Sequence, residues 1–131
     1  MAHKRENFST GSHFEHTYGY SRAVKVGETV YVSGTVGLNY DEGGIPTSAT
    51  DQFDQIVANL TRGLAMAGAR LEDVVQLVIY VTGADVFEEI GPSLKAAFGP
   101  IAPTSTAVVV AFPFPDIKLE ISATAVIGCG N

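Results

Sequence analysis

Residues 19–35, GYSRAVKVGETVYVSGT, decide the fold of this 131-residue chain. This stretch contains two short runs rich in β-formers, residues 22–26 and 29–33, which Gly27 and Glu28 separate. Valine and tyrosine favour strands, and a two-residue turn that contains glycine favours an antiparallel hairpin. We therefore predict a β-hairpin here, and no other part of the chain has a stronger local strand signal.

A long amphipathic helix is predicted after this hairpin. Residues 34–46 contain four glycines and read as an exposed loop, and Thr47 or Ser48 can then cap a helix with Asp51 in its first turn. Gly68 is placed to end this helix. Its apolar residues recur at helical spacing and form one stripe: Phe53, Ile56, Val57, Leu60, Leu64 and Ala67.

The remaining elements alternate between strand and helix. Residues 74–81 and 106–112 are apolar, β-branched runs that predict strands, and residues 85–98 predict a helix that Gly91-Pro92 must kink or restart. After a turn at 113–116, residues 118–127 alternate polar with apolar side chains, which predicts a strand with one polar face. With a weak first strand near residues 5–8, the order is β-β-β-α-β-α-β-β. The predicted fold class is α+β, with a mixed sheet and two helices on one face.

Composition limits the class of protein. The length suits one domain covering residues 1–131, and the 46% apolar and 17% charged residues suit a packed globular protein. A net charge of −6 disfavours nucleic acid and anionic membranes as partners, and the polar N-terminus predicts a cytoplasmic protein. The single cysteine, Cys129, is interpreted as a free terminal thiol, and no cofactor is expected.

Two helices cannot cover both faces of a sheet of about six strands. Residues 74–81 and 108–111 nevertheless look apolar on both sides, so the second face needs a cover. Burial against further copies of the same chain is the natural solution, because a large exposed apolar face is an interaction surface. The sequence therefore predicts a homo-oligomer.

The hairpin stretch resembles the YjgF/RidA family, also labelled endoribonuclease L-PSP. The resemblance covers nearly the whole chain, and its parts are specific only when taken together. The supporting segments are Arg5-Glu6-Asn7-Phe8-Ser9, Ala67-Gly68-Ala69, Val78-Ile79-Tyr80-Val81, Ala102-Pro103 and Lys118-Leu119-Glu120-Ile121. The resemblance implies a chorismate-mutase-like homotrimer, with an inner barrel of three sheets and small-molecule clefts between subunits. It also implies hydrolysis of reactive enamines and imines with loss of ammonia.

In such relatives an arginine at the start of the fifth strand holds the substrate carboxylate, and a glutamate on the last strand handles water. The resemblance places Tyr20 and Ser33 at two further cleft positions, and it places Thr104 and Ser122 at the positions of the arginine and the glutamate. A guanidinium grips a carboxylate through two charge-assisted hydrogen bonds, whereas a threonine supplies one neutral donor. We therefore expect an arginine-less member of the family, with a small polar ligand that can be uncharged and with poor turnover of 2-aminoacrylate.

Several residues have open alternatives at this point. Thr104, Ser105 and Thr106 can bind a ligand or can bond local backbone as strand-end hydroxyls. Glu120 and Ser122 are two apart on a strand, roughly 6.6 Å, so either can act on water from the same face. Glu120 can instead pair with a cation as part of the scaffold.

Arg22 shares strand parity with Tyr20, so it either replaces the missing cation or is solvated. His13, His16 and Glu15 invite a metal site, but their spacing does not fit one and we expect no metal. The two functional hypotheses are an imine or enamine hydrolase that uses Glu120 or hydroxyls, and a non-catalytic, chaperone-like or metabolite-binding trimer.

Overall fold

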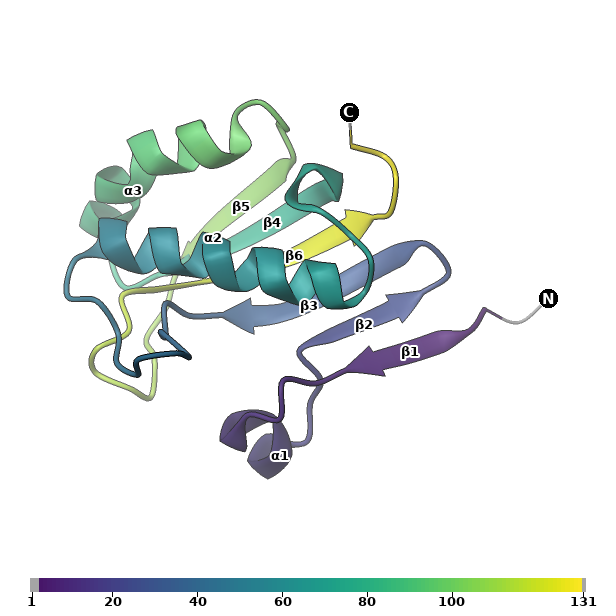
Figure 1. Cartoon of the computed structure of the whole chain (residues 1–131). Coiled ribbons are helices and arrows are strands. Elements are labelled where there is room, and N and C mark those ends of the chain that lie inside the picture. Colours follow the sequence, from purple (N-terminus) through teal and green to yellow (C-terminus); the bar gives the residue numbers. More distant parts are fainter. Residues whose placement is uncertain (1–2, 131) are drawn as a thin grey trace.

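The computed structural model describes residues 3–130 and contains one six-stranded mixed sheet with helices on one side (Figure 1). The sheet order is β1-β2-β3-β6-β4-β5. Strands β4 and β5 pair in parallel, and the other neighbours are antiparallel. The strands are β1 (Arg5–Phe8), β2 (Ala23–Val26), β3 (Thr29–Thr35), β4 (Val74–Val81), β5 (Thr104–Val109) and β6 (Leu119–Val126). The α+β prediction with a mixed sheet is confirmed.

The predicted hairpin forms β2 and β3. Val26 pairs with Thr29 across the turn, and Gly27 has φ = 58°, a left-handed conformation that glycine adopts without steric cost. At the other end of β3 the register with β6 shifts between Val32 and Thr35. This irregularity bends the end of β3 away from a regular ladder, next to the first residues of β6.

Two helices cover one face of the sheet: α2 (Ala49–Met66) and α3 (Ala84–Phe98) (Figure 1). Ser48 caps α2 by accepting a hydrogen bond from the Asp51 N–H at 3.1 Å, as predicted. In the predicted apolar stripe Phe53, Ile56, Leu60 and Leu64 are fully buried in the core, and Val57 is partly buried. Each fully buried large apolar side chain of this kind contributes about 1.5–3 kcal/mol. Helix α3 runs through Pro92 without restarting.

Helix α1 (His13–Tyr18) and a short 3₁₀ turn, η1 (Leu71–Asp73), were not predicted. Helix α1 lies between β1 and β2, away from the two covering helices (Figure 1). Its N-cap Ser12 accepts a hydrogen bond from the Glu15 N–H, and Gly19 closes it with φ = 73°. Strand β5 also differs from its prediction, because it begins two residues earlier and ends three residues earlier than residues 106–112.

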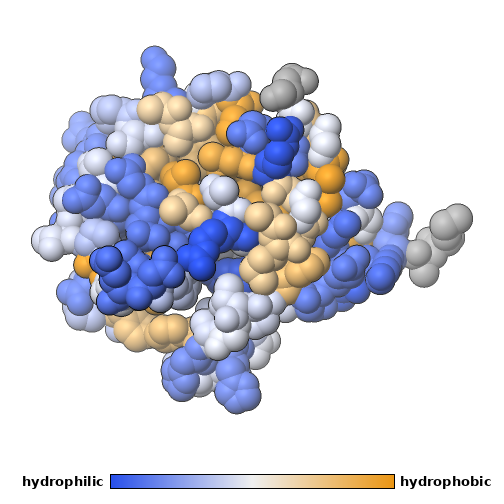
Figure 2. All heavy atoms as spheres, in the orientation of Figure 1, coloured by the Kyte–Doolittle hydropathy of each residue, from blue (hydrophilic) through white to orange (hydrophobic). Residues whose placement is uncertain are grey.

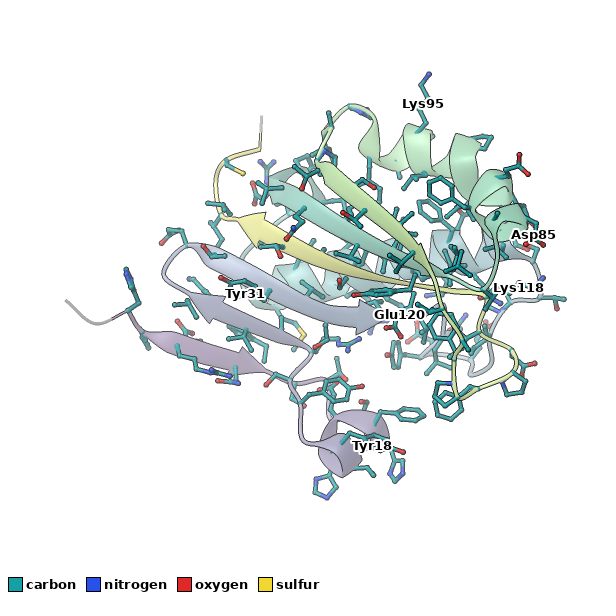
Figure 3. The ribbon with its side chains drawn as sticks, turned by 180° about the vertical axis from the view of Figure 1, so that it is seen from behind. Tyr18, Tyr31, Asp85, Lys95, Lys118 and Glu120 are labelled. Atoms are coloured by element: carbon teal, nitrogen blue, oxygen red, sulfur yellow. The ribbon has the colours of Figure 1, made fainter. Side chains whose placement is uncertain are left out.

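The second face of the sheet has no helix over it (Figure 3). Alternate residues of β6 separate the faces: those beginning with Leu119 are buried under the helices, and those beginning with Glu120 are half-buried. On the open side Tyr31 of β3 is 51% exposed. Every residue of the edge strand β5 is exposed, on both faces of the sheet. No helix among residues 3–130 has the length and apolar character to cross a membrane.

Candidate functional site

A pocket of about 360 Å³ lies where α1, the loop after β3 and the loop between β5 and β6 meet. Its walls are largely apolar, whereas a small polar ligand was expected from the sequence. The apolar side chains are those of Phe14, Val36, Leu38, Ile45, Phe112, Phe114 and Ile117, and the polar ones those of Ser12, Tyr20, Arg22, Tyr40, Asp116 and Glu120. A few convergent polar groups in an apolar hollow are typical of small-molecule sites.

Glu120 is one of the two carboxylates that line the pocket. It is the second residue of β6 and projects from the helix-free face (Figure 3), at the level of Tyr80 on β4. Among residues 3–130 no protein group donates a hydrogen bond to its carboxylate. Burial raises the pKa of Glu120 above its ordinary value, and the Arg22 charge opposes this only in part. A carboxyl group with a raised pKa and free lone pairs is suited to proton transfer near neutral pH.

Gly34 makes room for this carboxylate. A Cβ atom on Gly34 would collide with Oε1 and Cδ of Glu120, so the side chain lies directly over the glycine backbone. Glycine is needed here for close approach rather than for a left-handed φ, because its φ is not positive.

We predict that Gly34→Ala displaces the Glu120 carboxylate while the fold survives, because the colliding atoms belong to a flexible side-chain end. Any turnover that depends on this carboxylate should fall by about tenfold or more, since misplacing a reacting group by 1 Å can cost a factor of about 100. Steady-state kinetics and thermal unfolding, measured on one preparation, check this. Gly91→Ala, on α3, is the control outside the pocket, because a Cβ there meets nothing within 4 Å and the φ of Gly91 is not positive. Unchanged turnover in Gly34→Ala would contradict the prediction.

Tyr20 and Arg22 line the same pocket, but both precede β2, which begins at Ala23, so strand parity does not explain their proximity. The Arg22 guanidinium carbon lies 5.8 Å from the centroid of the Tyr20 ring, in a cation–π arrangement. Burial raises the pKa of Tyr20, and the Arg22 charge acts in the opposite sense. The Tyr20 hydroxyl therefore remains a protonated donor at the mouth of the pocket.

Arg22 is 6% exposed and is held by groups of the protein itself. Its guanidinium donates to the Thr35 hydroxyl at 3.4 Å and to the Gly34 carbonyl oxygen at 3.3 Å. Its Nε lies 4.0 Å from Oε2 of the buried Glu15 and has no hydrogen-bond partner among residues 3–130. Protein groups therefore already use part of the charge and hydrogen-bonding capacity of Arg22.

Glu15 ties α1 to the site. Its carboxylate accepts hydrogen bonds from the Ser9 hydroxyl at 2.7 Å, from the Thr10 backbone N–H at 3.1 Å and from the hydroxyls of Thr10 and Ser12. Burial acts to raise the pKa of Glu15, but these bonds together lower the pKa below its ordinary value. Glu15 is thus negatively charged at neutral pH, beside Arg22. No group of three or more His, Cys, Asp or Glu residues within 3–130 is placed to hold a metal.

The remaining site candidates do not line this pocket. The Ser33 hydroxyl donates to the Ser21 carbonyl oxygen at 2.7 Å, and the Thr104 hydroxyl donates to the Val75 carbonyl oxygen at 3.1 Å. Thr104 is paired with Gln76, four residues along β4 from the level of Glu120, a distance of roughly 13 Å. In the single chain both hydroxyls therefore donate to carbonyl oxygens of other segments of the chain rather than facing the pocket.

Ser122, Thr106 and Ser105 have no side-chain hydrogen bond among the described residues. Ser122 and Thr106 both pair with Val78 and therefore share the helix-free face. Ser105 pairs with Leu77, whose side chain is buried under the helices, and so it faces the other way. The structure therefore divides the eight candidates: Tyr20, Arg22 and Glu120 meet in the pocket, and the rest lie outside it.

A second hollow of about 720 Å³ lies on the α2 side of Arg22, beside Arg62 and Asn59. Ser12, Arg22 and Tyr40 line both hollows and form the wall between them. The second hollow contains no carboxylate, and its amide, Asn59, is already bonded to the carbonyl oxygens of Val36 and Leu38. The smaller hollow, with Glu120, is therefore the candidate site.

Comparison with known proteins shows the family of the chain. The model of the family described as endoribonuclease L-PSP matches residues 10–127, which includes the hairpin, both covering helices and the strand of Glu120. The chain belongs to the endoribonuclease L-PSP family. The resemblance inferred from the sequence is thereby confirmed.

Relatives within the L-PSP family carry names that describe a reaction. The chain is 32% identical over 109 residues to a 2-iminobutanoate/2-iminopropanoate deaminase of Dermatophagoides farinae, with 82% of this chain and 85% of the relative covered. A mouse protein of the same name is 32% identical over 110 residues, with 83% and 82% covered. The crystal structure of Rv2704 from Mycobacterium tuberculosis, a YjgF/YER057c/UK114 family member, has a TM-score of 0.85 at 37% identity and covers 95% of this chain and 100% of that one.

Proposed function

We propose that this chain hydrolyses imines to carbonyl compounds and ammonia, with Glu120 as the group that accepts and returns the proton. One observation carries the proposal: Glu120 projects into an apolar pocket, unbonded by protein groups and with a raised pKa. The deaminase names of two relatives support the same reaction class.

The reaction needs water and one proton-transferring group. In the proposed sequence, the water oxygen forms a bond to the carbon of the protonated imine (C=NH2⁺) while the C=N π electrons move to nitrogen, and Glu120 accepts the proton that water loses. Protonated Glu120 then donates this proton to the amine nitrogen. The C–N bond breaks, its electrons leave with ammonia, and the C=O bond forms as the hydroxyl proton is released to solvent. No oxidant or reductant takes part.

Glu120 suits both half-steps because its raised pKa lies closer to neutral than that of an exposed glutamate. We assign the Tyr20 hydroxyl, which lines the same pocket, as the donor of a hydrogen bond to the oxygen that enters the substrate. The test is imine consumption in competition with a chemical trap such as semicarbazide. The proposal requires that the imine is consumed faster than at the uncatalysed rate, and that this excess depends on Glu120.

We also propose that the chain assembles as a homotrimer through the helix-free face of the sheet. Tyr31, Val75 and Val108 are large apolar residues left exposed on β3, β4 and β5, and exposed apolar patches of this kind mark interaction surfaces. In such an assembly Thr104, Thr106 and Ser122 lie against a neighbouring copy, and the pocket mouth lies near the seam.

Light scattering at micromolar concentration should give three times the 13.8 kDa mass of one chain. Val108→Glu should shift the mass toward that of one chain, because it brings an unpaired charge into a buried interface. Lys95→Glu, on α3 and far from that face (Figure 3), is the charge-changed control and should remain trimeric. A wild-type mass of 13.8 kDa would contradict the assembly.

A further inference from the structure

We propose that the substrate of this site is an imine that lacks a carboxylate and carries a bulky apolar group, bound as the protonated iminium cation. The inference rests on the proposed hydrolysis at Glu120 and specifies the substrate class. The products are then a bulky aldehyde or ketone and ammonium, rather than a small 2-oxo acid.

The charge of the pocket favours a cationic ligand. Arg22 is the single lysine or arginine that lines it, and two carboxylates, Glu120 and Asp116, line it as well. The Arg22 charge is also matched by buried Glu15, whose Oε2 lies 4.0 Å away. The sum therefore favours a cation over an anion near Glu120, and a substrate carboxylate would gain little from an arginine that is already engaged.

A second copy of the chain does not reverse this balance. Strands β3, β4, β5 and β6, which form most of the helix-free face, contain no lysine, arginine or histidine. The loops that line the pocket, residues 36–45 and 112–117, contain none either, and Lys118 is not among the lining residues. A neighbour that docks through these strands therefore brings hydroxyl and apolar groups rather than a carboxylate anchor.

The apolar wall of the pocket favours a ligand with a bulky apolar group. Phe14 on α1 meets Phe114 on the β5–β6 loop edge to face, with centroids 5.4 Å apart and planes at 77°. Phe112, Leu38 and Ile45 line the same space. A three-carbon imino acid leaves most of the 360 Å³ unfilled and these side chains in contact with water. An apolar group such as phenyl or isobutyl fills it and gains from the burial of both surfaces.

Figure 2 shows the face of the molecule that bears α2 and α3. This face is hydrophilic over its left part, and hydrophobic residues gather toward its centre and upper right. Among residues 3–130, Phe14–Phe114 is the one aromatic pair outside the core that joins two segments; Phe53 and Phe98 meet inside the core. The Phe14–Phe114 pair is thus a feature of the pocket mouth rather than a general property of the chain.

The experiment compares two imines that differ only in the carboxylate. An amine oxidase generates one from 2-phenylethylamine, an L-amino acid oxidase generates the other from phenylalanine, and semicarbazide competes for each. We expect the carboxylate-free imine to have at least about tenfold higher kcat/KM, corresponding to one charge-assisted contact. Preference for the phenylalanine-derived or an alanine-derived imine would overturn this inference and leave the proposed hydrolysis standing. Failure to consume any imine would instead overturn the proposed function.

A binding experiment tests the substrate class without turnover. Phenylacetamidinium is a stable, planar cation that resembles the iminium, and we expect calorimetry to show it binding about tenfold or more tightly than either phenylpyruvate or acetamidinium. Phe114→Ala should remove most of its advantage over acetamidinium, whereas Phe87→Ala, an exposed aromatic on α3, should not. Tighter binding of phenylpyruvate, or equal binding of the two amidines, would overturn the inference.

Discussion

Glu120→Gln should lower the rate of imine hydrolysis by about 10²–10⁴-fold, the range that one positioned acid–base group supplies. The amide has nearly the same shape and can still accept a hydrogen bond, but it cannot accept the proton from water. KM should change less than kcat, since the pocket walls remain. Glu88→Gln makes the same change at an exposed glutamate of α3 and should leave the rate unaltered.

The same variant should be more stable than the wild type at high pH. Burial raises the folded-state pKa of Glu120 above its ordinary value of 4.5, so the folded protein binds this proton more tightly than the unfolded chain does. The wild type therefore loses stability as pH rises from the unfolded pKa through the folded pKa, and the glutamine variant does not. Urea unfolding of both proteins at pH 4 and pH 8 tests this. A stability difference that does not grow with pH, or full activity in Glu120→Gln, would remove Glu120 from its proposed role.

The sequence predicted the elements whose signals are local or periodic. The hairpin needed only Gly27 between two runs of β-formers, and α2 needed a cap at Ser48 and an apolar stripe. Alternation after Leu119 also separated the two faces of β6 correctly. Pro92 did not restart α3, because the carbonyl group that loses its partner belongs to Glu88, on the exposed side of the helix where water can satisfy it.

The elements that were missed depend on short or long-range signals. Helix α1 is too short to show a periodic pattern of apolar residues. Ser12 and Glu15 nevertheless have the spacing of a capping box, and Gly19 is placed to end a helix, so these capping residues could have predicted it. The limits of β5 are set by parallel pairing with β4 at residues 76–81, which its own composition does not reveal.

The pocket itself was only partly predictable. Glu120 and Ser122 share a face, and sequence parity cannot choose between them. The choice comes from the shifted register between β3 and β6, which brings Gly34 beneath Glu120 and leaves Ser122 further along the sheet. The aromatic residues Phe14, Phe112 and Phe114 come from segments about a hundred residues apart, so only the folded chain brings them together.

Glu15→Ala should destabilise the protein by about 3 kcal/mol, at the lower end of the range for breaking a buried ion pair, because the 4.0 Å contact to Arg22 is not a hydrogen bond. The variant also leaves the hydroxyls of Ser9, Thr10 and Ser12 without their acceptor. Urea unfolding at neutral pH measures the loss. Glu6→Ala, which breaks an exposed pair with Lys4 at 3.9 Å, is the matched control and should cost at most about 1 kcal/mol.

The pH dependence separates the Glu15 charge from simple loss of packing. Hydrogen bonds lower the folded-state pKa of Glu15 beneath its ordinary value of 4.5, so its contribution is complete above that value and is lost as pH falls through the folded pKa. The difference between wild type and Glu15→Ala should therefore shrink in acid. Arg22→Met combined with Glu15→Ala should cost less than the sum of the two single changes, since each alone strands the other's charge. Additive losses would mean that Glu15 holds α1 through its hydroxyl partners alone, and that Arg22 is free to meet a ligand.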